Sequence, residues 1–220
     1  MAEYFEPRTV DEAVSLLASD ENSRCLAGGA SLVAMMNFGM IEPSVLVSLR
    51  RIEEMRGIHR DDHNGLRIGA MTLHREVAGD ERLAGSNAVV REAAASIELA
   101  IRNMGTIGGA ISQADPSSDM NTALIAAGAV VEIVGPNGRR EVALDEFFVF
   151  YLTTVLEPGE MVTAVKLPQA AAGSVGGHDK VCRVHGDTAT VSADIVLDFD
   201  NDLVSDARLV IGCCGPVPLH

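Results

Sequence analysis

Two pairs of adjacent glycines are the residues whose type and spacing could do chemistry. They are Gly28-Gly29 and Gly108-Gly109. Because glycine has no Cβ, a loop that contains it can lie flat against a diphosphate, and its successive N–H groups can converge on the phosphate oxygens. The N-terminus of a following helix adds to the attraction for an anion. The pairs therefore indicate a backbone site for a diphosphate, with an ordinary tight turn as the alternative for each.

The spacing of the glycines and the net charge of the chain exclude several classes of ligand site. Neither pair fits GxGxxG or GxxxxGK[ST], so the Rossmann and P-loop patterns are excluded. The 220-residue chain has 31 acidic and 17 basic side chains, a formal net charge of -14. That balance argues against nucleic acid and anionic membranes, which attract clustered positive charge. An anionic diphosphate would have to be held by backbone amides, with few cations nearby.

The sequence predicts no metal centre in this chain. Its four cysteines lack zinc or iron–sulfur spacing, and its six histidines lack a ligand spacing. Cys213-Cys214 could form a strained disulfide or bind a soft metal, but buried thiols in an apolar strand over Leu209–Cys214 are favoured. The N-terminal segment has no signal-peptide pattern, and no run of eighteen apolar residues exists. We therefore expect a cytoplasmic protein.

Alternating helices and strands must position the first glycine pair. Thr9 and Glu12 form a capping box, which predicts a helix that begins at Val10. A short apolar strand over 24–27 then ends in the glycine pair. A helix over 32–36 and a buried strand over 45–49 follow.

A second unit is expected to begin near the turn at Asn64-Gly65 and to position the second glycine pair. An amphipathic helix over 88–100 leads into that pair. The other elements predicted here are a helix over 121–127 and strands over 66–68, 130–134, 139–143 and 161–167. The stretch 169–177 reads QAAAGSVGG, which is typical of a linker. Strands over 190–199 and 204–214 follow, and these roughly 40 residues are too few to close a core alone.

Longer patterns around the glycine pairs resemble a known family. They are Arg24-x-Leu26-Ala27-Gly28-Gly29-x-Ser31-Leu32, Ile68-Gly69-Ala70-Met71-Thr72, and Arg102-Asn103-x-Gly105-Thr106-Ile107-Gly108-Gly109 through Pro116 to Asp119. Two further segments are Glu160 to Pro168 and Lys180-x-x-Arg183-x-x-x-Asp187-x-Ala189. Together they resemble the FAD-binding (medium) subunit of molybdenum hydroxylases, the xanthine dehydrogenase and carbon monoxide dehydrogenase flavoprotein family. The resemblance covers essentially the whole chain.

The resemblance implies a fold as well as a cofactor. The fold is α+β, a vanillyl-alcohol-oxidase-type (PCMH-type) FAD-binding fold of two α/β subdomains plus an incomplete C-terminal α+β subdomain. The implied boundaries are 1–57 and 58–168 for the FAD-binding subdomains, 169–177 for the linker and 178–220 for the partial third subdomain. Either the sequence belongs to a longer chain, or its final strands pack on a partner.

The resemblance also implies which residues bind FAD. Residues 27–32 and 106–110 would wrap the diphosphate, and Ala70 would lie beside the cofactor. Asp119 would accept hydrogen bonds from the adenosine ribose hydroxyls, the segment 161–162 would pack on the isoalloxazine, and Lys180 would reach its polar rim. The full set is Ala27, Gly28, Gly29, Ala30, Ser31, Leu32, Ala70, Thr106, Ile107, Gly108, Gly109, Ala110, Asp119, Met161, Val162 and Lys180. No catalytic residue of this chain is implied, because the cofactor supplies the chemistry.

Structural alternatives remain for two of these residues. Asp119 could cap the helix that begins near Asn121, and Lys180 could be a solvated strand lysine. A loop turn explains Asp187 and Thr188 nearly as well as a place near the flavin does.

Three positions depart from the family pattern. Ala30 and Ala110 each replace a residue with a hydrogen-bonding side chain, which leaves backbone amides to hold the diphosphate. His178 stands where an aromatic residue is usual, two positions before Lys180.

The implied function is an FAD-binding electron-transfer subunit of a molybdenum-containing hydroxylase or dehydrogenase. Electrons would pass from a molybdopterin-binding large subunit through a [2Fe-2S] small subunit to FAD, and then to NAD, oxygen or another acceptor, in a heterotrimer or a dimer of heterotrimers. The alternative is a non-catalytic structural or assembly subunit with a degenerate FAD fold. An isolated FAD oxidase or reductase would need acid and base residues of its own, and the sequence shows no such group.

Overall fold

A small parallel sheet forms the N-terminal part of the chain. The computed structural model describes residues 2–184 and 186–220. In it, β1 (Glu3–Phe5) and β2 (Ser23–Leu26) pair in parallel with β3 (Val45–Ser48), which lies between them. The strand-turn-helix-strand order predicted around the first glycine pair is confirmed. The sequence analysis missed β1, because all three of its residues are exposed and show no alternation.

Two helices accompany this sheet. Helix α1 (Val10–Ala18) packs on β2 and β3. Its N-cap is Thr9, whose side chain accepts a hydrogen bond from the N–H of Glu12, as the capping pattern predicts. Helix α2 (Leu32–Asn37) follows the first glycine pair and contributes no buried residue.

A five-stranded antiparallel sheet occupies the middle of the molecule, in the order β4-β5-β10-β6-β7. The strands are β4 (Ile58–Arg60), β5 (Leu66–Gly69), β6 (Val130–Gly135), β7 (Gly138–Ala143) and β10 (Met161–Leu167). The centre is β10, in which every residue but Lys166 is buried. Its Val165 lies opposite Ile68 on one side and Val131 on the other. All of these strands except β4 were predicted.

The predicted helix over 88–100 is two helices. Helix α4 (Ala88–Ser96) ends because Ile97 adopts an extended conformation. Helix α5 (Leu99–Met104) then follows, and its N-cap is Glu98, whose carboxylate accepts hydrogen bonds from two otherwise unsatisfied N–H groups of the first turn. The apolar periodicity continues through Ile97 and therefore hides the break.

Helix α7 (Asp119–Ala126) corresponds to the predicted helix over 121–127. The remaining short elements were not predicted. They are η1 (Leu49–Arg51), η2 (Glu53–Met55), α3 (His74–Ala78), η3 (Gly85–Asn87), α6 (Ile107–Gln113), α8 (Leu144–Phe147), β8 (Phe148–Phe150) and β9 (Thr153–Thr154).

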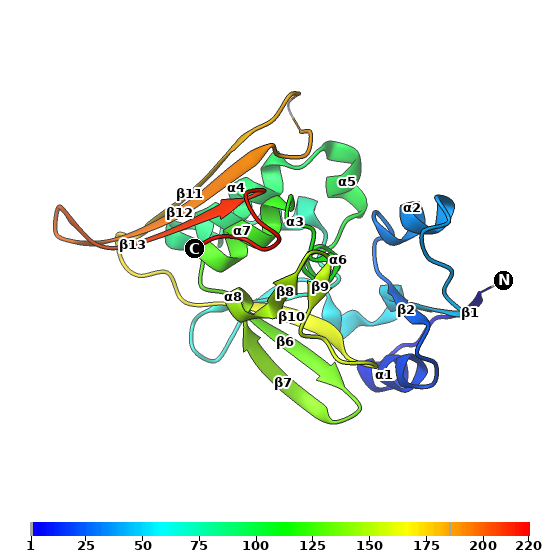
Figure 1. The fold of residues 1–220 in the computed structure, drawn as a ribbon. Coiled ribbons are helices and arrows are strands. Elements are labelled where there is room, and N and C mark those ends of the chain that lie inside the picture. Colours follow the sequence, from blue (N-terminus) through cyan, green and yellow to red (C-terminus); the bar gives the residue numbers. More distant parts are fainter. Residues whose placement is uncertain (1, 185) are drawn as a thin grey trace.

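A third, antiparallel sheet lies at the C-terminal end, with α4 and α7 against one face (Figure 1). Its strands are β11 (Val175–Val181), β12 (Val191–Asp200) and β13 (Leu203–Gly212). Strand β11 includes 175–177, which the sequence assigns to a linker. Glycine lets β11 lie close to the backbone of η3, since a Cβ at Gly176 would lie 2.2 Å from the carbonyl oxygen of Ser86.

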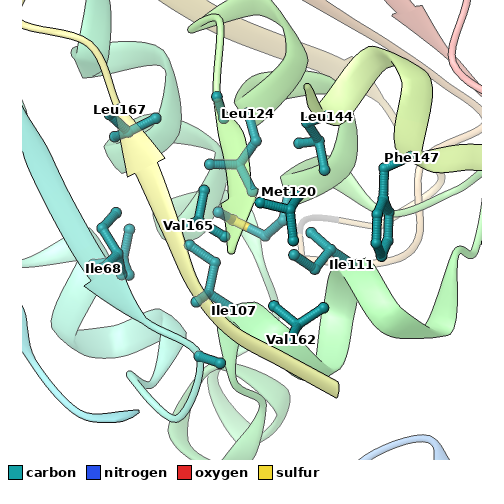
Figure 2. Packing of buried hydrophobic residues seen from close by; sticks show 14 of the residues in the cluster. Ile68, Ile107, Ile111, Met120, Leu124, Leu144, Phe147, Val162, Val165 and Leu167 are labelled. Atoms are coloured by element: carbon teal, nitrogen blue, oxygen red, sulfur yellow. The ribbon is translucent and has the colours of Figure 1, made fainter. Parts of the chain in front are cut away.

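One hydrophobic core joins the sheets and helices. It extends from Val10 of α1 to Val196 and Val210 of the third sheet. Figure 2 shows its centre, where side chains from β5, β10, α6, α7 and α8 gather: Ile68, Ile107, Ile111, Met120, Leu124, Leu144, Phe147, Val162, Val165 and Leu167. Each large apolar side chain buried in this way contributes about 1.5–3 kcal/mol relative to its exposed state.

The cysteines differ from the sequence expectation. Strand β13 ends at Gly212, so Cys213 and Cys214 follow it; Cys213 is half-buried and Cys214 is exposed. The reason is local, because Cys213 adopts a positive φ of 65°, which ends the strand. Within residues 2–184 and 186–220, no helix is long and apolar enough to cross a membrane.

Candidate functional site

A cavity of about 490 Å³ lies where the first glycine loop faces α6, the first turn of α7 and β11. Its size falls in the range typical of small-molecule sites. Every residue of the predicted cofactor set except Ile107 lines it. The cavity also has polar lining residues that the sequence analysis missed, namely Ser112, Gln113, Ser117 and Ser118. Asp187 and Thr188 line it as well.

The first glycine loop connects β2 to α2 and lies against the end of α5. A Cβ at Gly28 would lie 1.8 Å from the carbonyl oxygen of Met104, so no other residue fits at this position. Gly29 has φ +82°, in the left-handed region that favours glycine. Both glycines of the first pair are therefore required by the backbone geometry of the cavity wall.

The N–H groups of this loop are free to bind an anion. Within the described part of the chain, no hydrogen-bond acceptor is found for the N–H groups of residues 28–32. They belong to the loop and to the first turn of α2, where helix N–H groups have no partner within the helix. Five successive unpaired donors in residues that line the cavity provide an anion site without any lysine or arginine.

The second glycine loop begins α6, which the sequence analysis did not predict. Its N–H groups are already engaged: Gly108 donates to the carbonyl oxygen of Ala70 over 2.9 Å, and Gly109 donates to the Thr106 hydroxyl over 3.2 Å. A Cβ at Gly108 would lie 2.4 Å from the Cβ of Ala70. This pair therefore brings α6 against the Ala70 segment, and the free amide donors are on the first loop.

Ile107 belongs to the core and not to the cavity. Its side chain is fully buried, and its N–H donates to the carbonyl oxygen of Thr72 over 3.0 Å. The expectation that it wraps a diphosphate is therefore corrected, because neither its side chain nor its N–H is available.

An ion pair forms part of the cavity wall. Nζ of Lys180 donates to Oδ2 of Asp119 over 2.6 Å, and both side chains are 7% exposed. Asp119 is the first residue of α7, but the N-cap is Ser118. The helix-cap alternative for Asp119 and the solvated-lysine alternative for Lys180 are both wrong. Oδ1 of Asp119 is buried and has no hydrogen-bond partner within residues 2–184 and 186–220.

A second buried pair lies behind the first. Nδ1 of His178 is 2.8 Å from Oδ1 of Asp194, and the two side chains are 3% and 0% exposed. Nε2 of His178 is 3.2 Å from Oγ of Ser96, which also lies 3.3 Å from Oδ2 of Asp119. Burial raises the pKa of the Asp194 carboxyl, and the neighbouring His178 partly opposes this rise. Nothing in the spacing of Ser96 and Asp194 along the sequence indicates that they meet.

His74 is a further buried polar residue on the cavity wall that the sequence analysis missed. Its backbone N–H donates to the carbonyl oxygen of Gly105 over 3.1 Å. Its Nδ1 is buried without a hydrogen-bond partner among the described residues. Burial lowers the pKa of His74 to about 4, so the imidazole is neutral at physiological pH.

The charged lining residues are mostly acidic. The acidic ones are Glu98, Asp115, Asp119, Glu160 and Asp187, and the cationic ones among the described lining residues are Arg24 and Lys180. Met161 and Val162 supply an apolar wall and are 2% and 4% exposed. No group of three or more metal-ligating side chains occurs in the part of the chain described, which excludes His185.

Comparison with known proteins gives a consistent match. Residues 1–170 match the family described as the FAD binding domain in molybdopterin dehydrogenase. The carbon monoxide dehydrogenase medium chain of Afipia carboxidovorans is 38% identical over 219 residues, which cover 99% of this chain and 76% of that one.

Two solved structures show the same fold. A structure of carbon monoxide dehydrogenase from Hydrogenophaga pseudoflava superposes with a TM-score of 0.95 at 35% identity, covering 99% of this chain and 76% of that chain. Quinoline 2-oxidoreductase from Pseudomonas putida 86 superposes with a TM-score of 0.92 at 29% identity, with coverage of 99% and 76%.

Proposed function

The chain belongs to the family of FAD-binding domains of molybdopterin dehydrogenases, and on this premise we propose that it is the electron-transfer flavoprotein subunit of a molybdenum hydroxylase. Electrons would reach this subunit from a molybdopterin-binding large subunit through a [2Fe-2S] small subunit. They would leave to NAD, oxygen or another acceptor. FAD supplies the redox chemistry when bound, and the protein binds and tunes it.

The row of free N–H groups over residues 28–32 is the observation that carries this proposal. A diphosphate has several oxygens that accept hydrogen bonds, and the loop offers successive donors beside a cavity with acidic side chains. Gly28 lets the loop pack closely against the Met104 carbonyl oxygen, and Gly29 supplies its left-handed turn, so the two glycines hold this row of N–H groups in place. The residues present therefore fit a dinucleotide diphosphate.

We assign the Lys180–Asp119 pair to one region of the cofactor. Because Nζ and Oδ2 are 2.6 Å apart, an extended FAD cannot place its ribose on Asp119 and its ring edge on Lys180. The pyrimidine edge of the isoalloxazine carries an N–H donor between two carbonyl acceptors. The Asp119 carboxylate suits the donor, and the ammonium of Lys180 suits an acceptor.

The other lining residues have simpler roles in this proposal. Met161 and Val162 provide the apolar surface on which the ring packs, and they exclude water from it. Lys180 stabilises negative charge gained at the ring edge on reduction. The architecture proposed is the vanillyl-alcohol-oxidase-type fold, with the cavity between the parallel sheet over 1–57 and the five-stranded sheet over 58–168.

The proposal is tested by titrating the purified chain with FAD and following flavin fluorescence. We expect an equimolar complex with the visible absorbance of a bound flavin. A chain that binds no FAD under any condition of reconstitution would overturn the assignment.

The place in the enzyme complex needs a separate experiment. The chain is isolated from its native host, and the co-purifying proteins and cofactors are identified by mass spectrometry. We expect a molybdopterin chain and an iron–sulfur chain, and their absence would refute the proposed assembly. Bound flavin that the substrate of the complex does not reduce would instead indicate a structural subunit.

A further inference from the structure

Four side chains form a continuous hydrogen-bonded path from the interior of the third sheet to the cavity wall. The path starts at Asp194 of β12, passes His178 of β11 and Ser96 at the end of α4, and reaches Asp119 on the cavity wall. Lys180 closes it through its ion pair with Asp119. Only Asp119 and Lys180 line the cavity, so the other members act on it from behind.

With both carboxylates ionised, the charges in this path balance only when His178 is protonated. The charged groups that face its imidazole are Asp194 from β12, Asp119 from α7 at 4.0 Å, and Lys180 through Asp119. From α4, the Glu92 carboxylate accepts a hydrogen bond from the backbone N–H of His178 over 3.1 Å. With a neutral imidazole, two nearly fully buried carboxylates share one ammonium. With an imidazolium, two cations face two anions, which avoids a buried uncompensated charge.

Ser96 links the protonation of His178 to the hydrogen bonding of Asp119, because the serine hydroxyl has one hydrogen to donate. When both imidazole nitrogens carry protons, Nε2 donates to Oγ of Ser96, and the serine hydrogen is free for Oδ2 of Asp119 or the carbonyl oxygen of Ala93. When Nε2 is deprotonated, it accepts the serine hydrogen, and Asp119 keeps only Lys180 as a donor.

We propose that Asp194, His178 and Ser96 form a positioning relay that couples protonation of His178 to the charge and hydrogen bonding of the Asp119–Lys180 pair. Protonation adds one positive charge behind the cavity wall and frees the Ser96 hydrogen to bond to Asp119. The inference rests on the proposed FAD site, since it is the affinity for that anionic cofactor that the relay changes. FAD binds more tightly with His178 protonated, and its Kd rises as His178 loses its proton.

The first arm of the test measures His178 in the chain without cofactor. Histidine side chains are isotopically labelled, and their NMR signals are followed between about pH 5 and 8, where an unperturbed histidine changes charge. The His178 signal is identified by its loss in His178→Gln. His74 does not interfere, because its pKa of about 4 keeps it neutral over this window. We expect Ser96→Ala and Asp119→Asn to shift the His178 titration, since both change the path.

The second arm measures the Kd for FAD over the same pH range. In the unchanged chain, we expect the Kd to rise about tenfold, the effect of a coupling of one pKa unit. His178→Gln keeps a side chain that can bond to Asp194 and Ser96 but cannot titrate, so its Kd should be flat. Ser96→Ala should lose at least half of the pH effect. The matched control is His63→Gln, an exposed histidine outside the cavity, which should follow the unchanged chain.

The outcomes separate this inference from the proposed function. If FAD binds and His178→Gln shows the same pH dependence as the unchanged chain, the relay is wrong and the FAD site stands. If Ser96→Ala keeps the full pH effect, Ser96 does not transmit it and the relay is wrong. If no FAD binds, the proposed function fails. The relay is then judged by the first arm alone, and it is refuted if the His178 titration is not shifted in Asp119→Asn. Should His178→Gln fail to fold, Ser96→Ala decides the matter, because it leaves the His178–Asp194 pair intact.

Discussion

Lys180 and Asp119 are 61 residues apart in the sequence, and Nζ of the first lies 2.6 Å from Oδ2 of the second. This ion pair ties β11 to the first turn of α7 at the cavity wall. Both side chains are nearly inaccessible to solvent. The third sheet is therefore joined to the cofactor cavity by a charged contact as well as by the hydrophobic core.

Removing the lysine of this pair should destabilise the protein strongly. Lys180→Met leaves the Asp119 carboxylate buried without its cation, which typically lowers the free energy of unfolding by about 3–5 kcal/mol. The matched control is Lys166→Met. Lys166 pairs with the exposed Glu141, and its other partner, Glu132 at 3.9 Å, keeps the closer cation Arg67 at 2.8 Å, so a loss of about 1 kcal/mol or less is expected. Urea unfolding followed by circular dichroism measures both variants. Equal losses in the two would contradict the structural role given to Lys180.

A methyl group at the first glycine pair should close the anion site. In Gly28→Ala, the new Cβ would lie 1.8 Å from the carbonyl oxygen of Met104, so the loop must move away from α5. We expect the free energy of unfolding to fall by about 1–3 kcal/mol, as for other overpacking changes. The Kd for FAD should rise at least tenfold, because the N–H groups of the loop move from their positions.

The control for this change is Gly79→Ala at the end of α3. There the nearest atom to the new Cβ would be the carbonyl oxygen of Arg75 at 3.4 Å, an ordinary contact. We expect the free energy of unfolding to change by about 1 kcal/mol or less. FAD titration of both variants compares the sites directly, and similar affinities would show that the Gly28 loop does not bind the cofactor.

His74 should make stability fall in mild acid. Burial lowers its pKa from 6.5 to about 4 in the folded chain. Between these two pKa values the unfolded state binds more protons than the folded state, so the free energy of unfolding rises with pH. The stability that neutral His74 contributes is therefore complete above pH 6.5 and is lost as the pH falls from 6.5 to about 4. The full effect is about 3 kcal/mol, since one pKa unit corresponds to about 1.4 kcal/mol.

The contribution of His74 is isolated by His74→Phe. We expect its unfolding free energy to lose less than that of the unchanged chain between pH 6.5 and about pH 4. His63→Gln, at an exposed histidine, should retain the pH dependence of the unchanged chain. The expectation fails if urea midpoints of His74→Phe and the unchanged chain run parallel over this range.

Features of the site that depend on local sequence were predictable. Gly28 and Gly29 follow an apolar strand and precede a helix, so both their turn and their place on a cavity wall could be predicted from neighbouring residues. Most of the main sheet was predictable for the same reason. The break after Ser96 was not, because it depends on the Glu98 carboxylate, while the apolar spacing continues across it.

Features that depend on tertiary contacts could not be predicted. From the sequence, the N–H groups of Gly108 and Gly109 were expected to bind phosphate. In the structure they donate hydrogen bonds to the carbonyl oxygen of Ala70 and to the hydroxyl of Thr106. Likewise, His178 and Asp194 meet only because β11 and β12 pair in register, with one opposite the other. The separation of His178 and Asp194 along the sequence does not by itself indicate this register.

The contact between Gly28 and the carbonyl oxygen of Met104 has a consequence for how this cavity can diversify. It joins the segment before α2 to the end of α5 through main-chain atoms alone. The spacing of these two segments is therefore set by backbone atoms. Ala30 and Ala110 line the cavity but take no part in this contact, so larger or more polar side chains there would change the interior without disturbing it.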